Sequence, residues 1–286
     1  AEVLAVVVEV DTLVESLWTN LVNQIEVRAP STIDAVKHSR DAVELVIDKR
    51  VVSAACLMVA EGRRSATLEQ LGIAVQNYGA VGRAIGTVAS TVNPHYGCAQ
   101  QHFGDGILAL LPLAEERHVS VVWSLPSERH DQLLTLDGAA FAAALTRESE
   151  TTLGEVTEVG ERVSFPIGQS LVSDFNPMPR VLVIGDAART LHPLAGQGLN
   201  LGFADILSLQ QVLISARRKG EDIGTNKVLS KYENSRKLPN LTMIAMMELF
   251  KQGFNNTNPW IRLGRNLAFQ TTQESGWIKR KFIKEA

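Results

Sequence analysis

Apolar and polar positions follow one another along this chain in blocks whose lengths predict a mixed α/β fold. Two short uncharged apolar runs, at 56–60 and 181–184, are typical of buried parallel strands. The first run ends at Glu61 and Gly62, and the second ends at Gly185 and Asp186. Helical patterns follow at 66–71 and at 200–214. The repeated order of strand, turn and helix predicts a parallel sheet whose ligand lies at the carboxyl ends of its strands.

Other segments have the periodicity of antiparallel strands. Runs rich in Val, Ile, Leu and aromatic residues at 84–90, 98–103, 107–113 and 119–125 predict one antiparallel sheet. A smaller antiparallel set is predicted at 33–37, 43–47 and 50–54, and a short strand at 25–30. Further helices are predicted at 11–22, capped by Asp11 or Thr12, at 127–134, and at 137–148 behind an Asp137 cap. A helix over 225–254 is expected to turn inward Tyr232, Leu241, Ile244, Met247 and Phe250.

The stretch from Val181 to Gly202 carries the chemistry. Asp186 follows the buried strand and can accept hydrogen bonds from sugar-like hydroxyls. Gly196 and Gly198 let a flat ligand approach the backbone, because no Cβ intervenes. The loop leads into a helix N-terminus, whose free N–H groups favour a phosphate or a developing negative charge. A strand–loop–helix crossover with packing glycines is the alternative, but the ordered set of motif residues makes it the weaker hypothesis.

This stretch resembles the second flavin-binding motif of the FAD-dependent aromatic-ring monooxygenases. The run from His192 to Gly202 is most similar to the ubiquinone-biosynthesis hydroxylases, which act on polyprenylated phenols. Glu61 stands where that family carries an Asp in a second motif, and Arg189 stands where many relatives carry a His. The resemblance implies that the cofactor is bound by Gly185, Asp186, Pro193, Gly196, Gln197, Gly198, Leu199, Asn200, Glu61 and Gly62.

The resemblance implies an α/β fold with mixed α+β character. Residues 1–75 and 160–240 would form a discontinuous, partial Rossmann-like FAD-binding lobe. Residues 76–159 would form an antiparallel substrate lobe, near which His95, His102 and Trp123 are candidates, and 241–286 a C-terminal helical region. No G-x-G-x-x-G unit precedes the first lobe, so the chain is expected to lack its N-terminal βαβ unit.

Composition excludes some classes of function. The 286 residues carry a net charge of −3, which disfavours a general nucleic-acid binder. Cys56 and Cys98 have no metal-ligand spacing, are expected to be free thiols, and predict no metal site. No apolar run reaches the 18 or more residues that a membrane span requires. The tail instead predicts a basic face for anionic lipid or a partner, interleaved with aromatic residues: Arg262, Arg265, Lys279, Arg280, Lys281 and Lys284 with Trp260, Phe269, Trp277 and Phe282.

The predicted function is ring hydroxylation of a polyprenylated phenol, with FAD as cofactor, NAD(P)H as reductant and dioxygen as oxidant. Further expectations are contact with a ubiquinone-biosynthesis complex, a homo-oligomer, and a cytoplasmic location with peripheral contact to the inner membrane. The sequence names no general base. Two alternatives stay open: a flavin monooxygenase of a small soluble phenol, and an inactive flavin-fold fragment that serves as a binding or assembly subunit.

Overall fold

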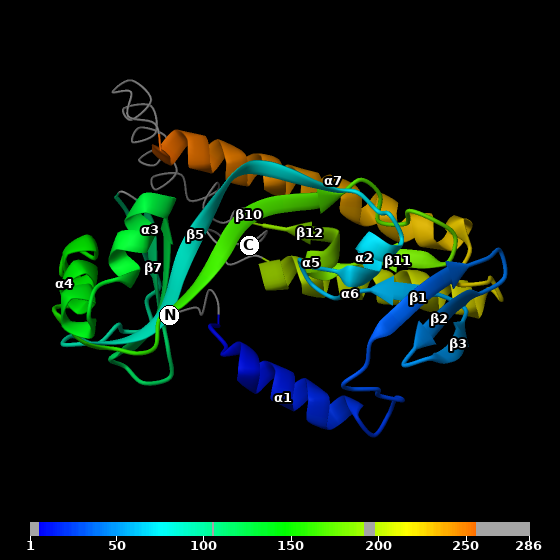
Figure 1. The fold of residues 1–286 in the computed structure, drawn as a ribbon, viewed down its shortest axis with the longest axis horizontal. Coiled ribbons are helices and arrows are strands. Elements are labelled where there is room, and N and C mark those ends of the chain that lie inside the picture. The colour runs from blue at the N-terminus through cyan, green and yellow to red at the C-terminus, as the bar shows by residue number, and fades with distance from the viewer. Residues whose placement is uncertain (1–5, 105, 192–197, 256–286) are drawn as a thin grey trace. The chain divides into compact units, whose positions relative to one another are not determined.

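The computed structural model describes residues 6–104, 106–191 and 198–255 (Figure 1). They form two compact units. The first unit holds the described residues up to Val27 and Val81–Ile167, and the second holds Arg28–Ala80 and the described residues from Gly168 onward. Strands β5 (Val75–Thr91) and β10 (Val163–Val172) contribute residues to both units. The proposed division into a flavin lobe and a substrate lobe stays a prediction. The basic tail lies outside the described residues from 256 onward.

The first unit is built on an antiparallel sheet with the strand order β5-β8-β7-β6, and β9 pairs with β5. Its other strands are β6 (Gln100–Phe103), β7 (Ile107–Pro112), β8 (His118–Leu125) and β9 (Val156–Val159). Helices α3 (Ser127–Leu134) and α4 (Gly138–Glu148) bury Leu133 and Phe141 in the same core as Trp123. Asp137 accepts a 2.7 Å hydrogen bond from the N–H of Ala140, which confirms the predicted cap. The sheet and both helices therefore follow the predicted pattern.

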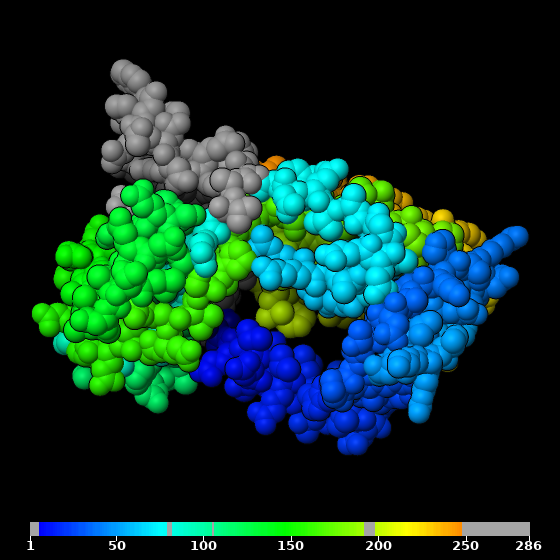
Figure 2. Space-filling model, in the orientation of Figure 1, coloured from blue at the N-terminus to red at the C-terminus, as the bar shows by residue number. Residues whose placement is uncertain are grey.

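The N-terminal segment of this unit departs from two predictions. Helix α1 (Val10–Leu21) begins after Glu9, and no side chain caps it, so Asp11 and Thr12 are not its caps. None of its residues is buried, and the side of the helix toward the viewer is drawn in dark blue in Figure 2. The strand predicted at 25–30 is wrong, because no described strand pairs with it and Pro30 offers no N–H to a ladder.

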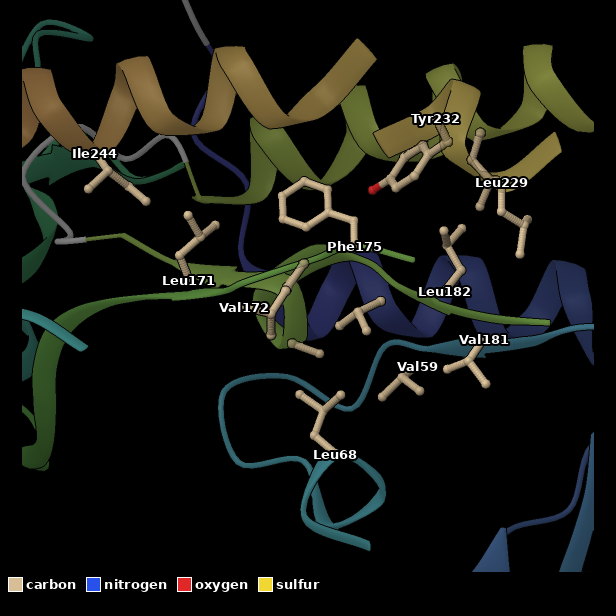
Figure 3. Close-up of a cluster of buried hydrophobic side chains, with 14 residues drawn as sticks. Val59, Leu68, Leu171, Val172, Phe175, Val181, Leu182, Leu229, Tyr232 and Ile244 are labelled. Atoms are coloured by element: carbon tan, nitrogen blue, oxygen red, sulfur yellow. The ribbon is translucent and has the colours of Figure 1, made fainter. Parts of the chain in front are cut away.

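The second unit contains the predicted small antiparallel sheet, β1 (Ile33–His38), β2 (Val43–Ile47) and β3 (Arg50–Ala54). Strands β4 (Leu57–Val59) and β11 (Val181–Val183) form a parallel pair, and β12 (Arg189–Thr190) pairs with β10. Four helices complete the unit: α2 (Ala66–Gln70), α5 (Gly185–Ala188), α6 (Gly198–Arg218) and α7 (Asn226–Asn255). Phe175 and Tyr232, whose ring centroids lie 6.2 Å apart, face each other in its core (Figure 3).

Helix α7 continues through Pro239. Tyr232, Ile244 and Met247 are buried as predicted, but Leu241 is 40% exposed and Asn240 is fully buried in its stead. The Asn240 amide donates a hydrogen bond to the carbonyl of Arg236 one turn earlier. The buried side of α7 therefore carries polar as well as apolar residues. The side chain of Phe250 lies outside the described residues.

Helix α6 has the length and composition of a membrane-spanning helix, with 21 residues and a hydropathy of 1.3. It exposes Leu199, Phe203, Ile206 and Leu207. Its inner side, however, carries the fully buried Asp205, which pairs with two arginines. Leu209 lies in the core of the second unit, although only 17% of the apolar window of α6 is buried inside the structure.

Candidate functional site

The carboxyl ends of β4 and β11 lie side by side in the second unit. Val183 is in register with Val59, and the N–H of Ile184 donates a 3.0 Å hydrogen bond to the Val59 carbonyl. Val59 is 2% exposed and Val183 is fully buried, which agrees with the apolar runs. Because the strands are parallel, the turns that begin at Glu61 and at Gly185 leave the same edge of the pair. Two predicted site segments are thereby brought together.

The turn after β11 presents an exposed carboxylate. Gly185 adopts a φ of +60°, in the left-handed region that favours glycine. Asp186 follows in the first turn of α5, and its residue is exposed. Within the described part of the chain, no group donates a hydrogen bond to its carboxylate, whereas its backbone carbonyl accepts one from Thr190 at 3.4 Å. The Asp186 side chain is therefore available to a ligand.

The first turn of α6 lies beside this carboxylate. A Cβ built on Gly198 would stand 4.0 Å from Oδ1 of Asp186, so the helix begins next to the acid. Leu199 and Asn200 are exposed in the same turn. The first N–H groups of a helix have no intrahelical acceptor and carry partial positive charge. Gly198 and Asp186 thus lie close together, while the predicted residues Pro193, Gly196 and Gln197 lie outside the described residues.

The carboxylate after β4 is engaged within the protein. Glu61 accepts hydrogen bonds from the Ser65 hydroxyl, from the Thr67 N–H at 3.1 Å and from the Thr67 hydroxyl at 2.7 Å. Burial raises its pKa, but these hydrogen bonds outweigh burial and hold the pKa of Glu61 below its usual value. Its carboxylate anchors the start of α2. Gly62, at a φ of +78°, has no atom within 4 Å of its Cβ position and leaves room above this turn.

A buried ionic cluster beneath the turn is absent from the predicted site. Oδ2 of Asp205 accepts a 2.7 Å bond from Nη1 of Arg189, and Oδ1 accepts a 2.7 Å bond from Nε of Arg236. Asp205 is fully buried, and Arg189 is 1% exposed. Burial lowers the pKa of Arg189, and the nearby Asp205 carboxylate opposes that shift. A carboxylate inside the apolar run of α6 was the sequence signal for this cluster.

The other candidate side chains belong to the first unit. His95 is 5% exposed; its Nε2 lies 3.0 Å from the Glu115 carbonyl, and its Nδ1 accepts the Gly97 N–H. Trp123 lies in the core of the first unit. His102 is half-buried, with Nε2 3.4 Å from Gln100 Oε1. Among residues 6–104, 106–191 and 198–255, no group of three His, Cys, Asp or Glu side chains could hold a metal ion.

Comparison with known proteins decides the family. The profile of the FAD binding domain family matches residues 22–244. The chain belongs to the FAD-binding monooxygenases of the ubiquinone-biosynthesis hydroxylase family. It is 34% identical to the ubiquinone hydroxylase UbiL of Rhodospirillum rubrum over 90% of this chain and 60% of that protein. It is 32% identical to the 3-demethoxyubiquinol 3-hydroxylase of Escherichia coli, over 99% of this chain and 73% of that protein. The predicted family is confirmed.

The fold of this flavoprotein family member matches solved structures as well. The p-nitrophenol 4-monooxygenase PnpA of Pseudomonas putida superposes with a TM-score of 0.73 at 19% identity, over 96% of this chain and 70% of that one. An anhydrotetracycline hydroxylase of Streptomyces rimosus gives a TM-score of 0.67 at 22% identity, over 91% of this chain and 52% of that one. The predicted mixed α/β fold is confirmed.

The residues at the two strand ends fit an FAD molecule. The exposed Asp186 carboxylate can accept hydrogen bonds from hydroxyl groups, and the helix N-terminus at Gly198 offers N–H donors. The turns at Gly62 and Gly185 have no atom near their Cβ positions, so a flat or extended group can approach both. FAD, when bound, supplies the redox chemistry with dioxygen. The role of each single residue toward it stays a prediction.

Proposed function

We propose that this chain contributes the flavin site of a hydroxylase that places a hydroxyl group on the ring of a polyprenylated phenol. The observation that carries the proposal is the exposed Asp186 carboxylate beside the α6 N-terminus, which accepts no hydrogen bond from the described residues, in a chain of the ubiquinone-biosynthesis hydroxylase family. The names of the two bacterial relatives place ubiquinone-type rings among their substrates. The antiparallel sheet of the first unit also exposes Val88 and Phe103, which suit an apolar substrate.

In the proposed reaction, one oxygen atom of dioxygen replaces a ring hydrogen as a hydroxyl group. The other oxygen atom leaves as water, and NAD(P)H supplies two electrons. Asp186 would hold the hydroxyls of the cofactor, and the first N–H groups of α6 would stabilise negative charge on its ring. The chain spans 60% of the Rhodospirillum relative, so this activity is proposed for the whole protein of which the described residues form a part.

The test supplies the full-length protein with FAD, dioxygen and either NADH or NADPH. Each mixture contains a prenylated phenol or the same phenol without its chain, and mass spectrometry follows the gain of one oxygen atom. Oxygen gain by the prenylated phenol supports the proposal. Gain by the short phenol alone favours a monooxygenase of a small soluble phenol. A bound, reducible flavin with no product from either phenol refutes both and favours a binding or assembly subunit.

A further inference from the structure

Asp205 lies at the centre of the candidate site without reaching its surface. It sits about two turns into α6 from Gly198, which begins the helix. Its Oδ2 accepts the backbone N–H of Gly185 at 3.3 Å, in addition to the bond from Arg189. One carboxylate therefore joins the turn after β11 to the helix whose N-terminus completes the site.

Arg189 closes the same arrangement from the other side. Its Nη1 donates to the carbonyl of Gly185 at 2.9 Å while it also donates to Asp205. Both backbone polar groups of Gly185 are thus held by one buried ion pair. Because Gly185 is the residue immediately before Asp186, this pair fixes the backbone from which the free carboxylate projects.

Stability alone is a poor explanation for this cluster. Two guanidinium groups share one buried carboxylate, and Nε and Nη2 of Arg189 have no hydrogen-bond partner within the described part of the chain. Buried ion pairs are often no more stabilising than apolar residues of the same volume, because desolvation offsets their attraction. A second buried arginine among the described residues, Arg180, pairs with Asp222, whose side chain is 46% exposed and so keeps much of its hydration. The Asp205–Arg189 pair, whose desolvation costs more, therefore lies next to the backbone of the proposed cofactor site.

We infer that Asp205 is a positioning residue for the cofactor: through Gly185 it holds the Asp186 carboxylate in place beside the N-terminus of α6. The inference rests on the proposed function, since it assumes that FAD binds at these residues. It assigns Asp205 no contact with the cofactor. Arg236 bonds the other carboxylate oxygen and donates to the Leu201 carbonyl in the first turn of α6, so both variants of the test carry the same substitution at Arg236.

The experiment compares two double variants with the same net charge in the cluster, Asp205→Asn/Arg236→Met and Asp205→Leu/Arg236→Met. Asparagine and leucine have similar shapes, but only asparagine keeps an oxygen that can accept the Gly185 N–H. The full-length protein is titrated with FAD by fluorescence. Hydrogen exchange of the Gly185 and Asp186 amides is measured without FAD, which gives a result that does not depend on the loaded enzyme.

The Asn double variant should bind FAD within about threefold of wild type, and the Leu double variant at least about tenfold more weakly, as the loss of one or more hydrogen bonds predicts. Exchange at Gly185 should accelerate in the Leu variant alone. Equal FAD affinity and equal exchange in the two variants would overturn the inference. If the Leu variant does not fold, Asp205→Glu takes its place: the charge stays and the acceptor moves by one methylene, so an unchanged dissociation constant overturns the inference. A wild-type protein that binds no FAD would instead refute the proposed function.

Discussion

Removal of the Asp186 carboxylate should separate cofactor affinity from stability. In the Asp186→Ala variant the described residues lose no hydrogen bond to this carboxylate, and the electrostatic attraction between Asp186 and the nearby Arg189 is lost. An exposed substitution of this kind changes the free energy of unfolding by within about 0.5 kcal/mol. The charge-assisted bond to FAD is worth about 1.5–3 kcal/mol, which raises the dissociation constant about 10- to 150-fold.

Two further variants sharpen this prediction. Asp186→Asn keeps an acceptor oxygen and loses the charge, so its dissociation constant should lie between those of wild type and Asp186→Ala. Glu61→Ala is the matched control, because it removes a carboxylate from the end of the neighbouring parallel strand. That carboxylate holds Ser65 and Thr67, so its loss should lower the free energy of unfolding by about 1 kcal/mol or more.

Urea unfolding followed by circular dichroism gives the stability of each apo-protein, and quenching of flavin fluorescence gives the dissociation constant. An unchanged dissociation constant in Asp186→Ala would refute the assignment of Asp186 to the cofactor site. A fall in apo-protein stability greater than about 1 kcal/mol would show that the carboxylate has a partner within the fold, since exposed substitutions without one cost less.

Three more predictions follow from single residues of the second unit. The pKa of Glu61 is lowered on folding, so its contribution to stability is complete above the unfolded pKa and is lost as pH falls through the folded pKa. The difference in unfolding free energy between wild type and Glu61→Gln should therefore shrink in acid. A difference that stays constant with pH would contradict the lowered pKa of Glu61. Gly224→Ala should lower the free energy of unfolding in urea by at least about 3 kcal/mol, because the new Cβ would meet the Ala55 carbonyl and the buried Arg180. The control Gly220→Ala should lower it by about 1 kcal/mol, because only the φ of +65° opposes a side chain there. Gly198→Val should give a protein that is folded by circular dichroism and colourless after purification, because the branched side chain fills the space before Asp186; full flavin absorbance would contradict this placement of the cofactor.

The strands of the site could be predicted because their signal is local. Short uncharged apolar runs, such as those at 56–60 and 181–184, are typical of fully buried strands, and β4 and β11 form within them. The acidic residue that follows each strand is likewise evident from the sequence. The parallel pairing then brings Glu61 and Asp186 to one edge, as the predicted ligand site requires.

The ionic cluster could not be predicted, because its members meet only in the folded chain. Asp205 lies 16 residues from Arg189 and 31 residues from Arg236. At position 189, where many relatives carry a His, the structure buries the Arg189 side chain against a carboxylate. Hydropathy also misplaces Asn240 and Leu241, since it cannot show that an amide finds an acceptor one turn away on its own helix.

The two carboxylates at the strand ends show why a motif position does not by itself establish a role. Both follow a buried strand at the same edge of the pair, and the resemblance assigned both to the cofactor. Glu61 is one methylene longer than the Asp of the family motif. Its carboxylate reaches the first turn of α2 and accepts hydrogen bonds from Ser65 and Thr67. Asp186 accepts no hydrogen bond on its carboxylate from the described residues, and Asp205 and Arg189 hold the backbone of the preceding Gly185. The proposed contact with the hydroxyls of FAD is therefore assigned to Asp186, while Glu61 supports the neighbouring turn from within the protein.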